Sequence, residues 1–259
     1  MSIPRLPTQA VILAAGLGSR LRPLTNHCPK PLVAVGGVPI LHNALGALAE
    51  AGVKKTTIVV GYRKDAIRAS CGHRFRGMDV AYVESSVFEH TGSAYSLWLA
   101  REALSAAGDA VLLEGDVFFA PDLLQRLAAC PTGDVAAVAP FTAAMEGTAV
   151  TLSPTGYVEG FRLKQTGGQF AREELFKTIN LFRFTGATLR ELLVPALGGL
   201  VAAGATRAYV EEVLAGLVGG GSLALAAVNC GDLKWYEVDS VEDLRSAEAM
   251  FLSGTLLPT

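Results

Sequence analysis

The stretch Val11–Leu32, VILAAGLGSRLRPLTNHCPKPL, decides the fold and raises the question of function. It begins with an apolar run that is typical of a buried strand, and it continues into a turn that contains Gly16 and Gly18. Glycine has no Cβ and tolerates positive φ, so the backbone of this turn can approach a ligand closely. Because successive amide N–H groups in such a turn form an anion-binding nest, the stretch predicts a strand that ends at a bound anion.

Basic residues follow the glycines. Arg20 offers a planar fork for phosphate oxygens and Lys30 a compact point charge, so this pair suits a polyphosphate whose phosphorus is under attack. Arg22 is interpreted as a solvated surface cation. A dinucleotide-binding GxGxxG motif needs a third glycine where this chain has Leu21, and no suitable ribose-binding acid follows about twenty residues later. The stretch therefore favours a polyphosphate over a nicotinamide dinucleotide.

Outward from this stretch, short runs rich in Val and Ile alternate with segments of helical period. This pattern is typical of a largely parallel sheet that is covered on both faces, and it predicts a three-layer α/β/α fold with a mostly parallel mixed central sheet. The predicted strands are Ala10–Ala14, Thr56–Gly61, Val80–Glu84, Ala110–Gly115 and Val135–Ala139. The predicted helices between them are Ile40–Ala51, Ala94–Ala107 and Pro121–Ala129.

After residue 140 the pattern becomes less regular. Thr148–Leu163 predicts two strands around a Ser-Pro-Thr-Gly turn, and LFKTINLFRF predicts a further strand. Helices follow at Leu189–Ala203 and Tyr209–Leu217, then a strand in KWYEVDS and a last helix at Val241–Met250. Because no repeat or linker is found, we expect one domain over residues 1–259, with a nucleotide-binding half at about 8–140 and an acceptor-binding half at about 141–259.

Composition limits the partners. Hydrophobic residues make up 51% of the chain and charged residues 18%, and the formal net charge of −2 gives no global attraction to nucleic acid or to an anionic membrane. The longest apolar stretches are interrupted before the ~20 residues that a membrane span needs. The four cysteines are spaced too irregularly for a CxxC metal site. We therefore expect a cytoplasmic protein that binds neither nucleic acid nor membrane.

At this point the motifs resemble a family. LAAGLGSRLRPLT followed by PKPLVAVGGVPIL is similar to the signature of nucleotidyltransferases that activate sugar phosphates and small alcohol phosphates with a nucleoside triphosphate. Within that family the chain resembles the cytidylyltransferases that act on phosphocholine and on phosphonates such as 2-aminoethylphosphonate or 2-hydroxyethylphosphonate. Three stretches carry this narrower resemblance: GSAYSLWLARE, FKTINLFRF and KWYEVDSVEDLRSAE.

The resemblance implies a Rossmann-like fold of the nucleotide-diphospho-sugar transferase type, CTP as the nucleotide and a small phosphate- or phosphonate-bearing acceptor. A sugar-1-phosphate or inositol-phosphate nucleotidyltransferase is the alternative within the same chemistry. A catalytically inactive, nucleotide-sensing regulatory paralogue is the alternative from another class. A monomer and a homodimer both fit, and the chain also fits a part of a fused pathway enzyme.

A metal ion belongs to this chemistry, because triphosphate reactions normally need Mg²⁺, which takes few protein carboxylates beside waters and phosphate oxygens. Asp116 and Asp239 each follow an apolar run, where a parallel sheet presents residues to its ligand edge. From the residues alone, Asp116 also suits the start of a turn, and Asp239 or Ser240 the cap of the last helix. The resemblance implies that the two aspartates hold Mg²⁺.

The resemblance also implies which residues bind the nucleotide. They are the strand end, the glycine turn and the cations of the first motif, together with the loop before YSLWLA, beside the nucleobase. Related enzymes often carry Asn in that loop, whereas this chain has Thr91–Ala94, which leaves the choice of cytosine less secure. The implied residues are Leu13, Ala14, Ala15, Gly16, Gly18, Ser19, Arg20, Lys30, Gly92 and Ser93.

The resemblance implies that Lys177 and Asn180 both face the acceptor and that Lys177 holds its phosphate or phosphonate. Glu212 matches a family acid that meets an amino or ammonium group, and a solvated helix face is an equal alternative. Trp235 suits a cation–π wall or the core. Because a phosphate monoester has a second pKa of ~6 and needs no general base, we expect direct in-line displacement, with Arg20, Lys30 and Lys177 as the catalytic cations.

Overall fold

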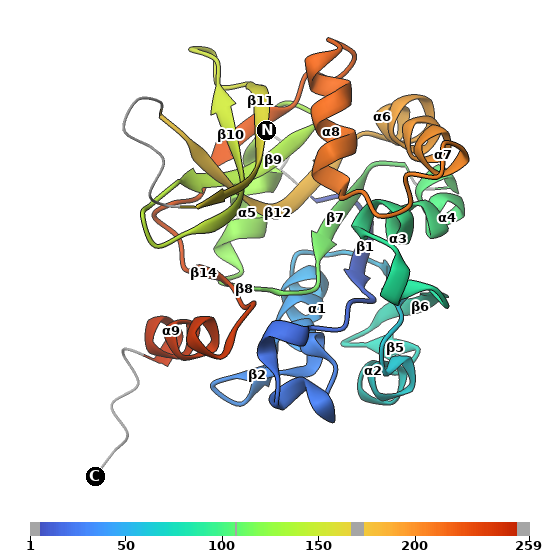
Figure 1. Cartoon of the computed structure of the whole chain (residues 1–259), viewed down its shortest axis with the longest axis vertical. Coiled ribbons are helices and arrows are strands. Elements are labelled where there is room, and N and C mark those ends of the chain that lie inside the picture. The colour runs from blue at the N-terminus through green and yellow to red at the C-terminus, as the bar shows by residue number, and fades with distance from the viewer. Residues whose placement is uncertain (1–5, 107, 167–173, 253–259) are drawn as a thin grey trace.

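The computed structural model describes residues 6–106, 108–166 and 174–252 (Figure 1). The centre of the sheet consists of four parallel strands in the order β7-β1-β4-β6. Residues Ala10–Ala14 are all buried, and alternate ones pack into different clusters. Ile12 belongs to the cluster that includes α1 and α5, whereas Val11 and Leu13 belong to the cluster that includes α3, α7 and α8. Apolar residues therefore point to both faces, which is why helices cover both.

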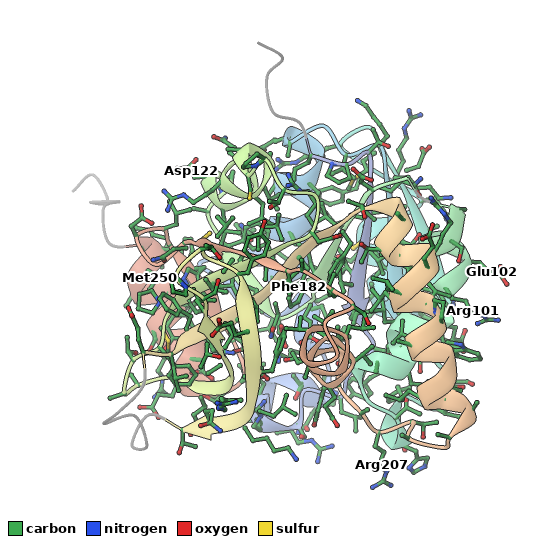
Figure 2. All side chains as sticks on the ribbon, turned by 90° about the horizontal axis from the view of Figure 1, so that it is seen from above. Arg101, Glu102, Asp122, Phe182, Arg207 and Met250 are labelled. Atoms are coloured by element: carbon green, nitrogen blue, oxygen red, sulfur yellow. The ribbon has the colours of Figure 1, made fainter. Side chains whose placement is uncertain are left out.

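The second half of the chain extends this sheet with mostly antiparallel strands. Strand β12 pairs antiparallel with β7, and it also pairs with β9 and β10. Phe182 of β12 is buried, and Figure 2 shows it among the interior side chains, with Arg101 and Glu102 at the periphery. Within the described residues the sheet has ten strands. They are β1 Gln9–Ala14, β4 Lys55–Val60, β5 Arg74–Phe75, β6 Met78–Glu84, β7 Ala110–Glu114, β9 Val135–Pro140, β10 Glu146–Leu152, β11 Val158–Thr166, β12 Phe176–Phe184 and β13 Ala226–Asn229.

Two short ribbons stand apart from this sheet. One pairs β8 with β14, and through this pairing the segment that precedes Asp239 lies beside the segment that follows Asp116. The other is the β2–β3 hairpin near the last helix. The strands are β2 Ala34–Val35, β3 Val38–Pro39, β8 Val117–Phe119 and β14 Trp235–Glu237. The helices are α1 Ile40–Glu50, α2 Lys64–Cys71, α3 Ser93–Leu99, α4 Arg101–Ala106, α5 Asp122–Ala129, α6 Gly186–Thr188, α7 Val194–Ala202, α8 Val210–Gly219 and α9 Val241–Leu252.

The predicted elements are confirmed, with small changes at their ends. The long helix predicted at Ala94–Ala107 consists of two helices, α3 and α4, that meet at Ala100, and Ala107 lies outside the described residues. Helix α2 was not predicted, because it is short, half of its eight residues are polar and only Ile67 and Cys71 are buried. No helix in the described part of the chain combines the length and the apolar character that crossing a membrane requires.

A buried arginine ties the two halves together. Arg183 of β12 donates hydrogen bonds to the carbonyl oxygens of Leu127 at 2.8 Å and Cys130 at 2.9 Å, at the end of α5. Because these acceptors lose a charged donor, Arg183→Met is expected to lower the free energy of unfolding by about 3 kcal/mol. Urea titration measures the change. The control is Arg76→Met, which removes an exposed ion pair with Glu50 and is expected to cost about 1 kcal/mol or less. Equal losses of unfolding free energy in the two variants would contradict the conclusion that the hydrogen bonds of Arg183 hold β12 to the end of α5.

Candidate active site

One cavity opens at the carboxyl ends of β1 and β7 and a second lies next to it, and Arg20 and Asp239 line both of them. The first has a volume of about 350 Å³ and the second about 740 Å³. All ten residues predicted for the nucleotide line the first cavity, together with Asp116. Of the four residues predicted for the acceptor, Lys177 and Trp235 line the second. The structure thus places the two predicted halves of the site side by side, with the two shared residues between them.

The glycine turn of the first motif packs against Lys30. Gly18 has φ +62°, and a Cβ at this position would lie 2.6 Å from Cβ of Lys30. Thr25 fixes the turn because its hydroxyl donates to the carbonyl oxygen of Gly18 at 2.8 Å. A Cβ at Gly16 would meet no atom within 4 Å. Gly18 is therefore required where Lys30 packs against the turn, whereas Gly16 leaves open space in the cavity.

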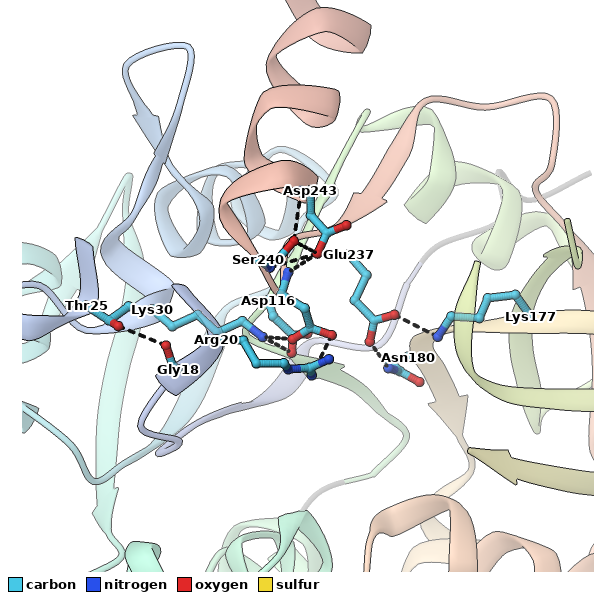
Figure 3. A network of polar contacts seen from close by, with 11 residues as sticks. Gly18, Arg20, Thr25, Lys30, Asp116, Lys177, Asn180, Glu237, Ser240 and Asp243 are labelled. Carbon is cyan, nitrogen blue, oxygen red and sulfur yellow. Dashed lines mark hydrogen bonds and ion pairs between the residues drawn. The ribbon is translucent and has the colours of Figure 1, made fainter. Parts of the chain in front are cut away.

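Lys30 bridges the two aspartates (Figure 3). Its ammonium donates to Oδ2 of Asp116 at 2.9 Å and to Oδ1 of Asp239 at 2.5 Å. Arg20 reaches the other oxygen of Asp239, Oδ2, also at 2.9 Å. Asp243 accepts hydrogen bonds from the backbone N–H groups of Asp239 and Ser240 at 3.1 and 2.7 Å, which fixes Asp239 at the start of α9. Three segments that are distant in sequence thus converge on one charged cluster.

These contacts keep Lys30 and Asp239 ionised. Burial acts to lower the pKa of Lys30, but the carboxylates of Asp116 and Asp239 outweigh burial and raise the pKa above its ordinary value. Burial acts to raise the pKa of Asp239, and the positive charges of Lys30 and Arg20 outweigh it, so that this pKa is lowered. Lys30 is therefore a cation at neutral pH and Asp239 an anion.

The donor set at this cluster fits Mg²⁺. Oδ1 of Asp116 is buried and has no hydrogen-bond partner among the described residues. Carboxylate oxygens are the hard ligands that Mg²⁺ takes, and it is usually held by one or two carboxylates plus substrate phosphates and waters. Across residues 6–106, 108–166 and 174–252, no group of three or more His, Cys, Asp or Glu could form an all-protein cage. Asp116 and Asp239 thus suit an ion that shares its coordination with a bound phosphate.

The acceptor side contains a second buried ion pair. Lys177 has 4% of its side chain exposed, and its ammonium lies 2.7 Å from Oε2 of Glu237. Asn180 is not in the wall of the cavity. Instead, its backbone has φ +58°, and its side-chain amide donates to Oε1 of Glu237 at 3.2 Å. Asn180 therefore orients Glu237, which in turn orients Lys177 (Figure 3).

Glu237 is a site residue that the sequence analysis missed. Burial raises its pKa to about 7, assisted by the negative charges of Asp116 and Asp239 and opposed by Lys177. The available signal was its position two residues before Asp239, because residues i and i+2 of an extended segment share a face. Burial likewise raises the pKa of Glu114 well above its ordinary value, and Glu114 lines the first cavity.

Glu212 lies elsewhere than the acceptor role requires. Its side chain is exposed and accepts a hydrogen bond from the backbone N–H of Tyr209 at 3.0 Å, which caps the start of α8. The buried acid is its neighbour Glu211, which accepts from the hydroxyl of Thr148 at 3.1 Å. One residue on a helix turns by about 100°, so these two acids face in different directions. Glu212 therefore caps α8 and does not have the position that the acceptor role predicted for it. The acid that α8 places in the interior is Glu211.

The loop Thr91–Ala94, which the sequence analysis expects beside the nucleobase, is held by contacts to the backbone of the chain. The hydroxyl of Ser93 accepts from the backbone N–H of Val210 at 3.0 Å, so Ser93 binds the start of α8. A Cβ on Gly92 would lie 2.1 Å from the carbonyl oxygen of Ala208, which leaves room only for glycine. Both residues line the cavity, and their own polar contacts are made to the chain.

Comparison with known proteins identifies the family of this chain. Residues 10–178 match the family described as the MobA-like NTP transferase domain, and the chain belongs to that family. It is 38% identical over 250 residues to CMP-5′-(3-aminopropyl)phosphonate synthase of Streptomyces rubellomurinus, an alignment that covers 95% of this chain and 39% of that protein. It is 36% identical over 110 residues to 2-aminoethylphosphonate cytidylyltransferase of Lancefieldella rimae, covering 42% of this chain and 43% of the relative.

Among solved structures, CTP:phosphocholine cytidylyltransferase from Streptococcus pneumoniae superposes with a TM-score of 0.74 at 21% identity, over 95% of this chain and 100% of that one. This likeness confirms the predicted fold class. The alignments cover less than half the length of each of the two curated relatives named above. The relatives confirm the predicted resemblance to cytidylyltransferases.

Proposed function

We propose that the chain is a cytidylyltransferase that transfers CMP from CTP to a small phosphonate or phosphate acceptor, in the presence of Mg²⁺, and releases pyrophosphate. One observation carries this proposal: a cavity lined by the glycine turn with Lys30 and a cavity lined by the buried Lys177 meet at Arg20 and Asp239. The names of the relatives above supply the nucleotide and the class of acceptor.

In the proposed reaction the acceptor oxygen attacks the α-phosphorus of CTP directly. Lys177 binds the acceptor's oxyanion in the second cavity, while Lys30 and Arg20 bind the triphosphate in the first. Mg²⁺, held by Asp116 and Asp239, would neutralise charge on the phosphates. The chain's own residues thus orient the two reactants and stabilise developing negative charge, and neither step needs a general base or a covalent intermediate.

The second cavity supports an acceptor whose far end is cationic. Glu146 and Glu242 line it as exposed carboxylates, with no ion pair to any described residue. Trp235 and Tyr236 add aromatic walls. Carboxylates and aromatic faces attract an ammonium group, so the cavity suits an aminoalkylphosphonate.

A substrate panel tests the proposal. Pyrophosphate release is measured with CTP, UTP, ATP and GTP against 2-aminoethylphosphonate, 3-aminopropylphosphonate, phosphocholine, glucose 1-phosphate and an inositol phosphate. We expect CTP with an aminoalkylphosphonate to react fastest. Faster turnover with a sugar phosphate would replace the proposed acceptor, and no metal-dependent turnover with any pair would favour a nucleotide-sensing role.

Gly147 provides a test of the lysine's position. A Cβ there would lie 2.8 Å from Nζ of Lys177, so Gly147→Ala is expected to displace the ammonium. Loss of part of one charged hydrogen bond predicts a KM for the acceptor that is about tenfold higher, with the KM for CTP unchanged. Steady-state kinetics measures both.

The matched control for this prediction is Gly156→Ala. Gly156 also has positive φ, but a Cβ there meets nothing within 4 Å. Any general effect of backbone strain appears in both variants, whereas the change in acceptor KM is expected only in Gly147→Ala. An unchanged acceptor KM in Gly147→Ala would show that Lys177 does not bind the acceptor.

A further inference from the structure

Lys30 occupies the place between Asp116 and Asp239 that the proposed function gives to a metal ion. Its ammonium contacts one oxygen of each carboxylate, at 2.9 and 2.5 Å, and Arg20 contacts the second oxygen of Asp239 at 2.9 Å. Three of the four carboxylate oxygens are therefore bound by the chain's own cations. The fourth, Oδ1 of Asp116, is the buried oxygen without a partner among the described residues.

A cation that binds these carboxylates has to compete with Lys30. Hydrogen bonds between charged groups are short and strong, and this pair is sheltered because only 13% of the Lys30 side chain is exposed. Gly18 packs against the Cβ end of the Lys30 side chain, and this contact helps to keep the ammonium at the carboxylates. In the free chain the metal site is therefore already neutralised.

The same lysine can be drawn away by a triphosphate. Lys30 and Arg20 both line the first cavity, and phosphate oxygens are good acceptors for both kinds of side chain. The Lys30 ammonium has three N–H donors and uses two of them on the carboxylates, so any phosphate contact beyond the first replaces a carboxylate contact. Binding of the triphosphate therefore frees the oxygens of Asp116 and Asp239 at the moment when a metal–phosphate pair arrives.

We propose that Lys30 is a built-in counter-ion that holds the metal position closed in the free chain and exchanges the carboxylates for the triphosphate when the nucleotide enters. This inference rests on the proposed function, because it takes the metal and triphosphate sites from it. It adds that the free chain binds metal weakly and that metal and nucleotide enter together.

The test is metal binding to the full chain without nucleotide. Mn²⁺ is used as the probe, because it is a hard divalent ion that accepts the same oxygen ligands as Mg²⁺ and its free concentration is measured by electron paramagnetic resonance. Lys30→Met removes the ammonium, so we expect Mn²⁺ to bind about tenfold or more tightly than to the wild type, as the loss of a competing charged contact implies. Lys30→Arg keeps a cation and is expected to bind Mn²⁺ weakly, like the wild type.

Two further variants locate the effect. Arg22→Met removes a neighbouring exposed charge that contacts neither aspartate, and it is expected to leave Mn²⁺ affinity unchanged. The double variant Lys30→Met with Asp116→Asn is expected to lose the gain. Unchanged or weaker Mn²⁺ binding in Lys30→Met would overturn the proposal, as would a gain that survives the loss of Asp116 or that appears equally in Arg22→Met.

The removal of Lys30 leaves two carboxylates close together, so the stability of Lys30→Met is measured as well. A larger rise in Tm on addition of Mg²⁺ than in the wild type is expected, since a ligand stabilises the state that binds it. An equal or smaller rise would overturn the proposal. Wild-type turnover in the substrate panel reports on the proposed function separately, because Mn²⁺ binding to the free chain requires no catalysis.

Discussion

Asp116→Asn is expected to lower turnover by about 10²–10³-fold, the loss that follows removal of one well-placed group that stabilises charge in the transition state. Oδ1 of Asp116 has no partner among the described residues, and Oδ2 binds Lys30 at 2.9 Å, so the replacement affects both the proposed metal position and the cation that we propose binds the triphosphate. The measurement is pyrophosphate release at saturating CTP, acceptor and Mg²⁺.

The control for this prediction is Asp122→Asn, which neutralises an exposed acid in the first turn of α5, outside both cavities. It is expected to keep wild-type turnover. Thermal unfolding of both variants separates a catalytic loss from misfolding. Wild-type turnover in a folded Asp116→Asn variant would refute the assignment of this carboxylate.

Lys177→Met is expected to lower kcat/KM for the acceptor by about 10²–10³-fold and to leave the KM for CTP unchanged. The reason is that Lys177 is a buried cation in the wall of the second cavity, while Lys30, which we propose binds the triphosphate, lines the first. Steady-state kinetics with each substrate varied in turn measures the two effects. The control is Lys55→Met, at an exposed lysine at the start of β4.

A structural explanation of that loss is tested by the double variant Lys177→Met with Glu237→Gln. Lys177→Met alone leaves the buried Glu237 carboxylate without its cation, which is destabilising, whereas removal of both charges is close to neutral. We expect the double variant to recover the stability that the single variant loses, while acceptor kcat/KM stays low. Recovery of activity together with stability would mean that Lys177 only supports the fold.

Much of the lining of the first cavity was predictable, because many of its residues lie close together in the sequence. Strand β1, the glycine turn and Arg20 follow one another along the chain, so a contiguous motif places them together. The layers of sheet and helices were predictable too, because apolar residues repeat with a different period in strands than in helices. The close contact between Gly18 and Lys30 was not predictable, because it depends on how the loop that carries Lys30 packs against the glycine turn.

The acceptor half was less predictable because contacts between distant segments build it. The ion pair of Lys177 and Glu237 joins β12 to β14, and Gly147 on β10 makes room for it. No spacing in the sequence encodes these pairings. The prediction missed that Glu211, and not Glu212, points inward from α8, and this has a different cause. The sequence does not show which elements pack against the helix, so it does not fix which of two adjacent acids faces the interior.

The central claim is that the acceptor's own oxygen displaces pyrophosphate from the α-phosphorus across the junction at Arg20 and Asp239. The most direct measurement uses 3-aminopropylphosphonate labelled with ¹⁸O at all three phosphonate oxygens, incubated with CTP, Mg²⁺ and the wild-type chain, and ³¹P NMR of the product. The account predicts an ¹⁸O-induced shift at both phosphorus atoms of the product and unlabelled pyrophosphate. A product with no isotope shift at the cytidylyl phosphorus, or label in the pyrophosphate, would contradict it.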